Sequence, residues 1–307
     1  MAQQNLTATT LTPPLKWHGG KSYLARRIVA LMPRHLHYVE PFAGGLAVLL
    51  ERDPNDRKLW ASDCAQRGGV SEVVNDLSGD LTNFWRVLQH PGLFPVFQRR
   101  CQATPLSRLE FDQADLLDDT DSVSRAWAFF VRCRQSRAGT FKGFTSLTRS
   151  RTRRHINGNA SEWLGSVEGL AAIHARLIPV VVENLDAVKL IPREDTPETL
   201  FYCDPPYLHE TRVSTNAYAH EMTAEQHRQL LNVLLACKGK VILSGYPNEL
   251  YDRALSQWRR VDVDIANHAA GGESKRRMTE CLWLNYEQTG SKPATNQSRG
   301  DLFGAEA

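Results

Sequence analysis

A short run, FYCDPPY at 201–207, follows an apolar stretch and carries the clearest chemistry in the sequence. Proline has no N–H, so Pro205 and Pro206 make a stiff turn whose carbonyls are free to accept hydrogen bonds. The Asp204 carboxylate and the Pro205 carbonyl can then accept both hydrogens of a planar amino group. Such acceptors make the nitrogen nucleophilic toward an electrophilic carbon held in line, and Tyr207 is expected to stack on the planar group. A strand-ending structural turn is the alternative interpretation.

A glycine turn lies far upstream, where an expected strand over 37–42 leads into Ala-Gly-Gly at 43–45 and a helix over 46–52. Glycine lets backbone approach a ligand closely, and the acid that ends the next strand, Asp76, can accept both hydroxyls of a ribose. The spacing lacks the G-x-G-x-x-G order that seats a pyrophosphate. The pattern favours a nucleoside without phosphates, although a tight structural turn with a surface aspartate is compatible with the same residues.

Alternating strands and helices must position these groups. Further strands are expected at 72–76, 180–186, 198–204 and 240–246, and helices at 22–32, 77–89 and 223–237. This alternation predicts an α/β fold with a mostly parallel, doubly wound sheet. Ligands of such sheets bind beyond the carboxyl ends of the strands. The segment 40–45, Asp76, Asp186 and the segment 204–207 are therefore expected to converge on one crevice.

A basic segment interrupts the alternation. Residues 122–161 contain no Asp or Glu and carry a charge of +9, which leaves −6 for the rest of a chain whose net charge is +3. Lys and Arg gain free energy by displacing counterions from phosphates, so this segment favours a nucleic acid partner over a merely solvated face. Its expected DNA-binding residues are Arg132, Arg134, Arg137, Lys142, Arg149, Arg151, Arg153 and Arg154. Arg212, Lys275 and Arg276 are further candidates, for which a solvated role is as compatible.

The chain is expected to divide into a flexible N-terminus (1–14), a catalytic domain (15–95 and 169–287), a smaller, mainly helical domain inserted at 96–168, and a disordered tail (288–307). It contains no run of about 18 apolar residues and no signal-peptide pattern, which predicts a cytoplasmic protein without a membrane partner. Six scattered cysteines lack metal-ligand spacing, so no metal is expected. A monomer is expected, although nothing in the sequence sets the oligomeric state.

Collinear segments make the chain resemble the amino-group DNA methyltransferases, specifically the Dam-like adenine methylases that use S-adenosylmethionine. The matching segments are LKWHGGK (15–21), YVEPFAGG (38–45), EVVNDL (72–77), VVVENLDAVKLI (180–191), FYCDPPY (201–207), KVILSGY (240–246) and TECLWLNY (279–286). The resemblance implies a Rossmann-like sheet, an inserted target-recognition domain that binds duplex DNA, and transfer of a methyl group to the 6-amino group of a flipped-out adenine.

The resemblance also assigns residues. It implies that S-adenosylmethionine is held by Trp17, Lys21, Glu40, Phe42, Ala43, Gly44, Asp76, Asp186 and Asp204, and that Asp204, Pro205, Pro206 and Tyr207 form the catalytic motif. Two features depart from the family. Leu46 stands where the family's turn often has its last glycine, and residues 53–71 lengthen the link to Asp76.

Three other functions are weighed against this one. A carbon-5 cytosine methyltransferase uses a cysteine that typically follows proline, and no Cys follows Pro here, which nearly excludes that class. An amino-methyltransferase of cytosine, RNA or a protein amide stays open, as does a DNA-binding protein that has lost turnover. Neither the recognised DNA site nor a role in restriction-modification or in a phage follows from the sequence. The triplet Asp301-Leu302-Phe303 loosely resembles peptides that dock on replication clamps, but a random disordered end is favoured.

Overall fold

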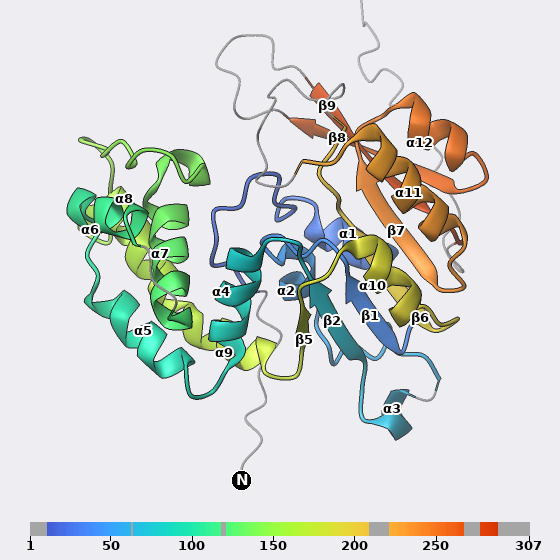
Figure 1. Cartoon of the computed structure of the whole chain (residues 1–307), viewed down its shortest axis with the longest axis horizontal. Coiled ribbons are helices and arrows are strands. Elements are labelled where there is room, and N and C mark those ends of the chain that lie inside the picture. The colour runs from blue at the N-terminus through green and yellow to red at the C-terminus, as the bar shows by residue number, and fades with distance from the viewer. Residues whose placement is uncertain (1–10, 63, 118–120, 209–220, 267–276, 288–307) are drawn as a thin grey trace, which may run out of the picture.

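The centre of the molecule is a seven-stranded sheet in the order β5-β2-β1-β6-β7-β9-β8 (Figure 1). This computed structural model describes residues 11–62, 64–117, 121–208, 221–266 and 277–287. In sheet order the strands span Val181–Glu183, Ser71–Asn75, His37–Glu40, Thr199–Cys203, Lys240–Gly245, Arg277–Leu284 and Arg259–Ala266. Strands β5, β2, β1, β6 and β7 pair in parallel, and β9 is antiparallel to β7 and β8. The expected mostly parallel, Rossmann-like α/β sheet is confirmed.

Successive strand residues alternate between two cores, as the two-residue period of a strand requires. Tyr38 and Tyr202 belong to one core, whereas Val39 and Cys203 belong to the other. The first core packs against α1, α2 and α4, which span Ala25–Leu31, Ala47–Glu51 and Gly79–Gln89. The second packs against α10, α11 and α12, which span Ala187–Glu194, Ala224–Leu235 and Glu249–Ala254. Covering both faces explains why the central strands are almost wholly apolar.

A group of helices lies beside α4 at one end of the sheet (Figure 1). It comprises α5 (Phe94–Ala103), α6 (Arg108–Asp115), α7 (Ser122–Gln135), α8 (Gly158–Glu168) and α9 (Leu170–Leu177), with the 3-10 turn η1 (Arg137–Gly139) and the hairpin β3 (Thr152–Arg153) and β4 (Ile156–Asn157). Phe84 of α4 contacts Phe97 and Phe130, so the apolar side chains of this group continue the first core. The boundaries of an inserted domain at 96–168 stay a prediction.

Several expected residues and segments lie outside the described residues. They are residues 1–10, the loop 209–220 with Arg212, residues 267–276 with Lys275 and Arg276, and the tail 288–307 with its Asp-Leu-Phe triplet. Within the described residues, Pro14 is buried although it was expected in a flexible N-terminus. No helix within the described part of the chain is long and apolar enough to cross a membrane. The short helix α3 (Cys64–Arg67) falls in the long link before β2.

Helix boundaries follow local capping. Thr223 and Gln226 form a capping box at the start of α11, with reciprocal bonds of 3.2 and 2.8 Å. Gly239 does not end that helix, which stops at Leu235. A Cβ at Gly239 would lie 2.8 Å from the Thr199 carbonyl oxygen, so glycine is needed there for close approach to β6 instead.

Leu46 occupies the turn position at which the family often has glycine. Its backbone lies in the left-handed region, with φ +57° and ψ +29°, and its side chain is fully buried at the start of α2. Left-handed backbone costs a residue with a Cβ about 1–2 kcal/mol. The chain therefore keeps the glycine-like turn and offsets the strain by burying the leucine side chain.

We expect Leu46→Gly to lose less unfolding free energy than Leu46→Ala. Both variants lose the buried side chain, which costs about 2–5 kcal/mol, but only glycine relieves the strain of positive φ, worth about 1 kcal/mol. Urea unfolding of both proteins measures the difference. An alanine variant as stable as the glycine variant would contradict this account of the turn.

Candidate active site

A cavity of about 620 Å³ opens beyond the carboxyl ends of the parallel strands. Segments that follow β1, β2, β5 and β6 line it, because carboxyl ends of parallel strands meet at one sheet edge. The volume lies in the ordinary range of small-molecule sites, about 300–1,000 Å³. Its lining includes Trp17, Lys21, Glu40, Phe42, Ala43, Gly44, Asp76, Asp186 and Asp204. All residues expected to bind a cofactor thus face one cavity, although binding itself stays a prediction.

The glycine turn is fixed from three sides. Gly44 has φ +48° and donates its N–H to an Asp76 carboxylate oxygen at 3.1 Å. Its carbonyl accepts a bond of 3.1 Å from Trp85 Nε1 on α4. A Cβ at Gly44 would lie 2.8 Å from Trp17 Nε1, so any larger residue would displace the indole. Asp76 thereby belongs to the turn despite the lengthened link before β2.

Asp204 follows the last residue of β6 and is held by three donors. Lys21 Nζ lies 2.8 Å from each carboxylate oxygen. Ser244, on the adjacent strand β7, donates its hydroxyl at 2.8 Å, and the Tyr207 hydroxyl, whose single hydrogen is shared with Glu280, lies 3.1 Å away. The side chain still keeps 18% of its surface exposed and lines the cavity. Asp204 is therefore rigidly placed yet accessible to a ligand.

Glu280, on β9, completes a buried charge cluster that the sequence analysis missed. It is fully buried, accepts a bond from the Tyr207 hydroxyl, and lies 3.7 Å from Lys21 Nζ. Burial raises the pKa of Glu280, and Lys21 opposes that rise. Burial alone lowers the pKa of Lys21, but the carboxylates of Asp204 and Glu280 outweigh it, so the Lys21 pKa is raised and the ammonium stays charged at neutral pH.

Tyr207 is buried, and its ring does not line the cavity. The ring lies 4.8 Å from Lys21 Nζ and packs edge-on against Tyr246, with ring centroids 4.7 Å apart. Burial, with Asp204 and Glu280 nearby, raises the Tyr207 pKa, which keeps the phenol a donor. Pro206 lines the cavity, whereas Pro205 is buried. Stacking of Tyr207 on a base stays a prediction.

Cys203 and His227 do not line the cavity. Burial raises the pKa of the Cys203 thiol well above its usual range, and the side chain packs in the second core. A thiol held in that state is a poor nucleophile. His227 is buried in α11 with Nδ1 2.8 Å from the Tyr251 hydroxyl. In the described part of the chain no group of His, Cys, Asp and Glu is arranged to hold a metal ion.

The basic segment reaches the cavity through its loop after α7. Gly139, Thr140, Phe141 and Lys142 line the cavity beside Trp17. A Cβ at Gly139 would lie 1.9 Å from the Lys16 carbonyl oxygen, so only glycine allows this loop to pack on the N-terminal motif. The cavity and the basic segment therefore share one wall.

The expected DNA-binding residues separate into two groups. Arg132 pairs with Asp115 at 2.7 Å, and Arg134 donates to the Glu162 backbone carbonyl at 3.1 Å, so both guanidinium groups are engaged within the protein. The exposed residues are Arg137, Lys142, Arg149, Arg151, Arg153 and Arg154. Among these, Arg153 lies 3.7 Å from Glu162 and Arg154 lies 2.9 Å from Glu168. The exposed set is the better candidate for phosphate contact.

The structure has a mostly parallel sheet, with a glycine turn and acids at the carboxyl ends of its strands. These features are typical of α/β enzymes that bind their ligands at this edge of the sheet. The family model described as D12 class N6 adenine-specific DNA methyltransferase matches residues 17–267. The chain belongs to this family, whose members are enzymes. This agrees with the resemblance seen in the sequence.

Two curated relatives are consistent with the family. A DNA N-6-adenine-methyltransferase of Escherichia phage P1 is 26% identical over 255 residues, which cover 77% of this chain but only 30% of the phage protein. A type II methyltransferase of Lactococcus lactis subsp. cremoris is 25% identical over 299 residues, which cover 90% of this chain and 96% of the relative. The chain thus spans less than a third of the first relative and almost the whole of the second.

We expect Lys21→Met to lose about 3–5 kcal/mol of unfolding free energy at pH 8, because two carboxylates remain without their buried counter-charge. The loss should shrink at pH 5, since a raised pKa lets Glu280 take up a proton in the folded state as the pH falls through it. Urea unfolding at both pH values measures this.

Lys16→Met is the matched control. Lys16 forms a partly exposed pair with Glu162 at 3.3 Å, so its removal should cost no more than about 1 kcal/mol. Equal losses in the two variants would show that the Lys21 cluster does not stabilise the fold.

Proposed function

We propose that the protein transfers a methyl group from S-adenosylmethionine to the 6-amino group of an adenine flipped out of duplex DNA, by direct in-line attack. Membership of the adenine-specific DNA methyltransferase family supports the reaction class. The observation that carries the proposal is Asp204, which lines the same cavity as the glycine turn and is held by Lys21 and Ser244.

The residues of the cavity fit such a cofactor. The glycine turn and Trp17 form a narrow cradle that a Cβ at Gly44 would obstruct, and Asp76 stands beside it as a ribose acceptor. Glu40, buried at the end of β1, offers an acid in a cavity that would take a cationic ligand. When bound, the cofactor supplies an electrophilic methyl group. Asp186, which caps α10 and lines the cavity, would contact the cofactor or the base.

Asp204 has acceptor capacity left for an amino group. A carboxylate offers about four lone-pair sites, and oxygen Oδ1 is already contacted by Ser244, Lys21 and the Tyr207 hydroxyl. Oδ2 accepts a bond from Lys21 and keeps a site for an N–H of the substrate. The Pro205 carbonyl would accept the second hydrogen. Positive charge that develops on the nitrogen would then lie beside a fixed negative group, which lowers the barrier without reorganisation.

The exposed basic residues would hold the DNA. A base inside a duplex cannot reach such a cavity, so it must leave the stack. The loop 139–142 forms one wall of the cavity and belongs to the basic segment, which would place the DNA backbone next to the opening. This arrangement supports duplex DNA as the partner, and the basic segment as its target-recognition part.

Tritiated methyl transfer from S-adenosylmethionine to unmethylated duplex DNA, followed by digestion to nucleosides, tests the reaction. We expect N6-methyladenine with the wild type and a fall of at least about 100-fold in kcat with Asp204→Asn, which removes the charged acceptor. Glu225→Gln, an exposed acid of α11 paired with Arg228, should keep full activity. Methylcytosine or methylated RNA would overturn the substrate, and no transfer by the wild type would overturn the enzymatic proposal.

Arg149→Gln and Arg151→Gln should each weaken DNA binding in all sequences and reduce the slope of log K against log salt by about one. Arg253→Gln, which removes an exposed arginine of α12 at the other end of the sheet, should leave that slope unchanged. Fluorescence anisotropy with labelled duplexes at several salt concentrations measures it. Unchanged slopes in the Arg149→Gln and Arg151→Gln variants would show that DNA binds to another surface of the protein.

A further inference from the structure

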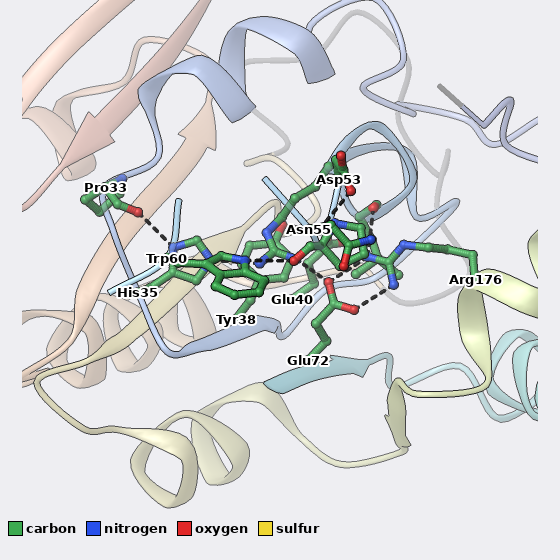
Figure 2. Close-up of polar contacts among 12 residues, drawn as sticks. Pro33, His35, Tyr38, Glu40, Asp53, Asn55, Trp60, Glu72 and Arg176 are labelled. Atoms are coloured by element: carbon green, nitrogen blue, oxygen red, sulfur yellow. Dashed lines mark hydrogen bonds and ion pairs between the residues drawn. The ribbon is translucent and has the colours of Figure 1, made fainter. Parts of the chain in front are cut away.

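A buried network of charged groups lies on the face of the sheet that carries the first core, and Figure 2 shows its polar contacts. Arg52, just after α2, donates to Glu72 of β2 and lies 3.1 Å from His35 Nε2. Arg176 of α9 binds Glu72 through two bonds of 2.6 Å. The side chains of Arg52 and Glu72 are 0% and 3% exposed. Burying so many charges is costly unless each is compensated.

Within the described residues, this network contains two positive charges but only one negative charge. His35 Nδ1 lies 2.8 Å from the Pro33 carbonyl, which only accepts, so Nδ1 carries the proton and Nε2 accepts from Arg52. His35 is therefore neutral, in agreement with a pKa lowered to about 4 by burial and by Arg52. Two arginines then face the single carboxylate of Glu72.

Tyr38 connects this surplus charge to the cavity. Its ring lies 4.9 Å from the Arg52 guanidinium carbon, and it pairs with Glu72 in the register of β1 and β2. Its hydroxyl donates a bond of 2.6 Å to Glu40, which is two residues further along β1 and therefore on the same face. Glu40 is 1% exposed and lines the cavity. Figure 2 shows Tyr38, Glu40 and Glu72 in this arrangement.

We propose that Tyr38 is a positioning residue, which ties the Glu40 carboxylate to the buried arginine network and holds it to receive a cationic group of the cofactor. The inference rests on the proposed use of S-adenosylmethionine, whose sulfonium and ammonium groups are both cations. Arg52, through its contact with the Tyr38 ring, supports the same carboxylate from below. The neighbouring acids Glu72 and Asp204 disfavour the ionised form of Glu40, and a bound cation would favour that form.

Binding should therefore be linked to proton release. Burial, aided by Glu72 and Asp204, raises the pKa of Glu40 to about 8, while the Tyr38 hydroxyl lowers it. Glu40 is thus mostly protonated at pH 7 in the free protein, and a bound cation favours its ionised form. Within the described residues, the titratable and charged groups that interact with it electrostatically are Tyr38, Arg52, Glu72, Tyr202, Asp204 and, from the other face of the sheet, Cys203.

Calorimetric titration in two buffers of different ionisation enthalpy measures the protons released on binding. At pH 7 we expect the wild type to release about one proton per cofactor, and its affinity to rise up to roughly tenfold per pH unit between pH 6 and 7.5. Glu40→Gln should release none and show a flat pH profile. Tyr38→Phe removes a hydrogen bond that stabilises the ionised form of Glu40. We therefore expect this variant to bind the cofactor about tenfold more weakly, and its affinity should begin to rise only at higher pH.

Tyr286→Phe is the matched control, since it removes another buried tyrosine hydroxyl, bonded to the Leu31 carbonyl at 2.9 Å. It should bind like the wild type. Titrations with S-adenosylmethionine and S-adenosylhomocysteine distinguish the cations, because the second lacks the sulfonium. Proton release with both assigns the ammonium group, and release with the first alone assigns the sulfonium.

The inference and the proposed function fail in different ways. Cofactor binding without proton release, or a Tyr38→Phe profile identical to that of the wild type, would overturn the role of Tyr38 and leave the proposed function standing. No binding of either cofactor by the folded wild-type protein would overturn the proposed function itself.

Discussion

The ammonium group of Lys21 is the interaction on which the site depends. It lies among the Asp204 carboxylate, the Tyr207 ring and the Glu280 carboxylate, so it joins the segment 204–207 and β9 to the N-terminal motif. The buried Glu280 carboxylate and the partly buried Asp204 carboxylate repel one another, and the lysine is what allows both to remain in the fold. Because Lys21 also donates to the Gly19 carbonyl at 2.9 Å, the glycine-rich segment before it is fixed by the same charge cluster.

A second constraint is the close packing around Trp17. The indole packs over Gly44 and Gly45 on one side and near Phe129 and Phe141 on the other. The N-terminal motif is thus held between the glycine turn of the sheet and the helical group. Because the loop 139–142 lines the cavity next to this contact, a shift of the basic segment would change the shape of the cavity. If the basic segment binds DNA and the cavity binds the cofactor, as proposed, this contact links the two binding events physically.

Some parts of the site were readable from the sequence, and others were not. The run ending in Asp204 and the turn around Gly44 contain combinations of residues that are seldom needed for structure alone. A chemical role for them could therefore be predicted from the sequence. Glu280 was missed although it directly precedes the apolar run CLWL in the same strand, which is a signal of a paired buried charge. The strand β8 was also missed, despite the alternation of charged and apolar residues in RRVDVDIA. Both belong to the antiparallel hairpin that departs from the β/α rhythm.

The sequence by itself determined the parallel sheet, the order of the motifs and the residue types at the strand ends, because periodicity, glycine and proline act over a few neighbouring residues. Only the tertiary structure decided which charges meet. It brought Lys21 to Asp204 and Glu280, engaged Arg134 within the helical group, and packed the buried Tyr207 ring against Tyr246. Such contacts depend on strand order and register between distant segments, which no local pattern encodes.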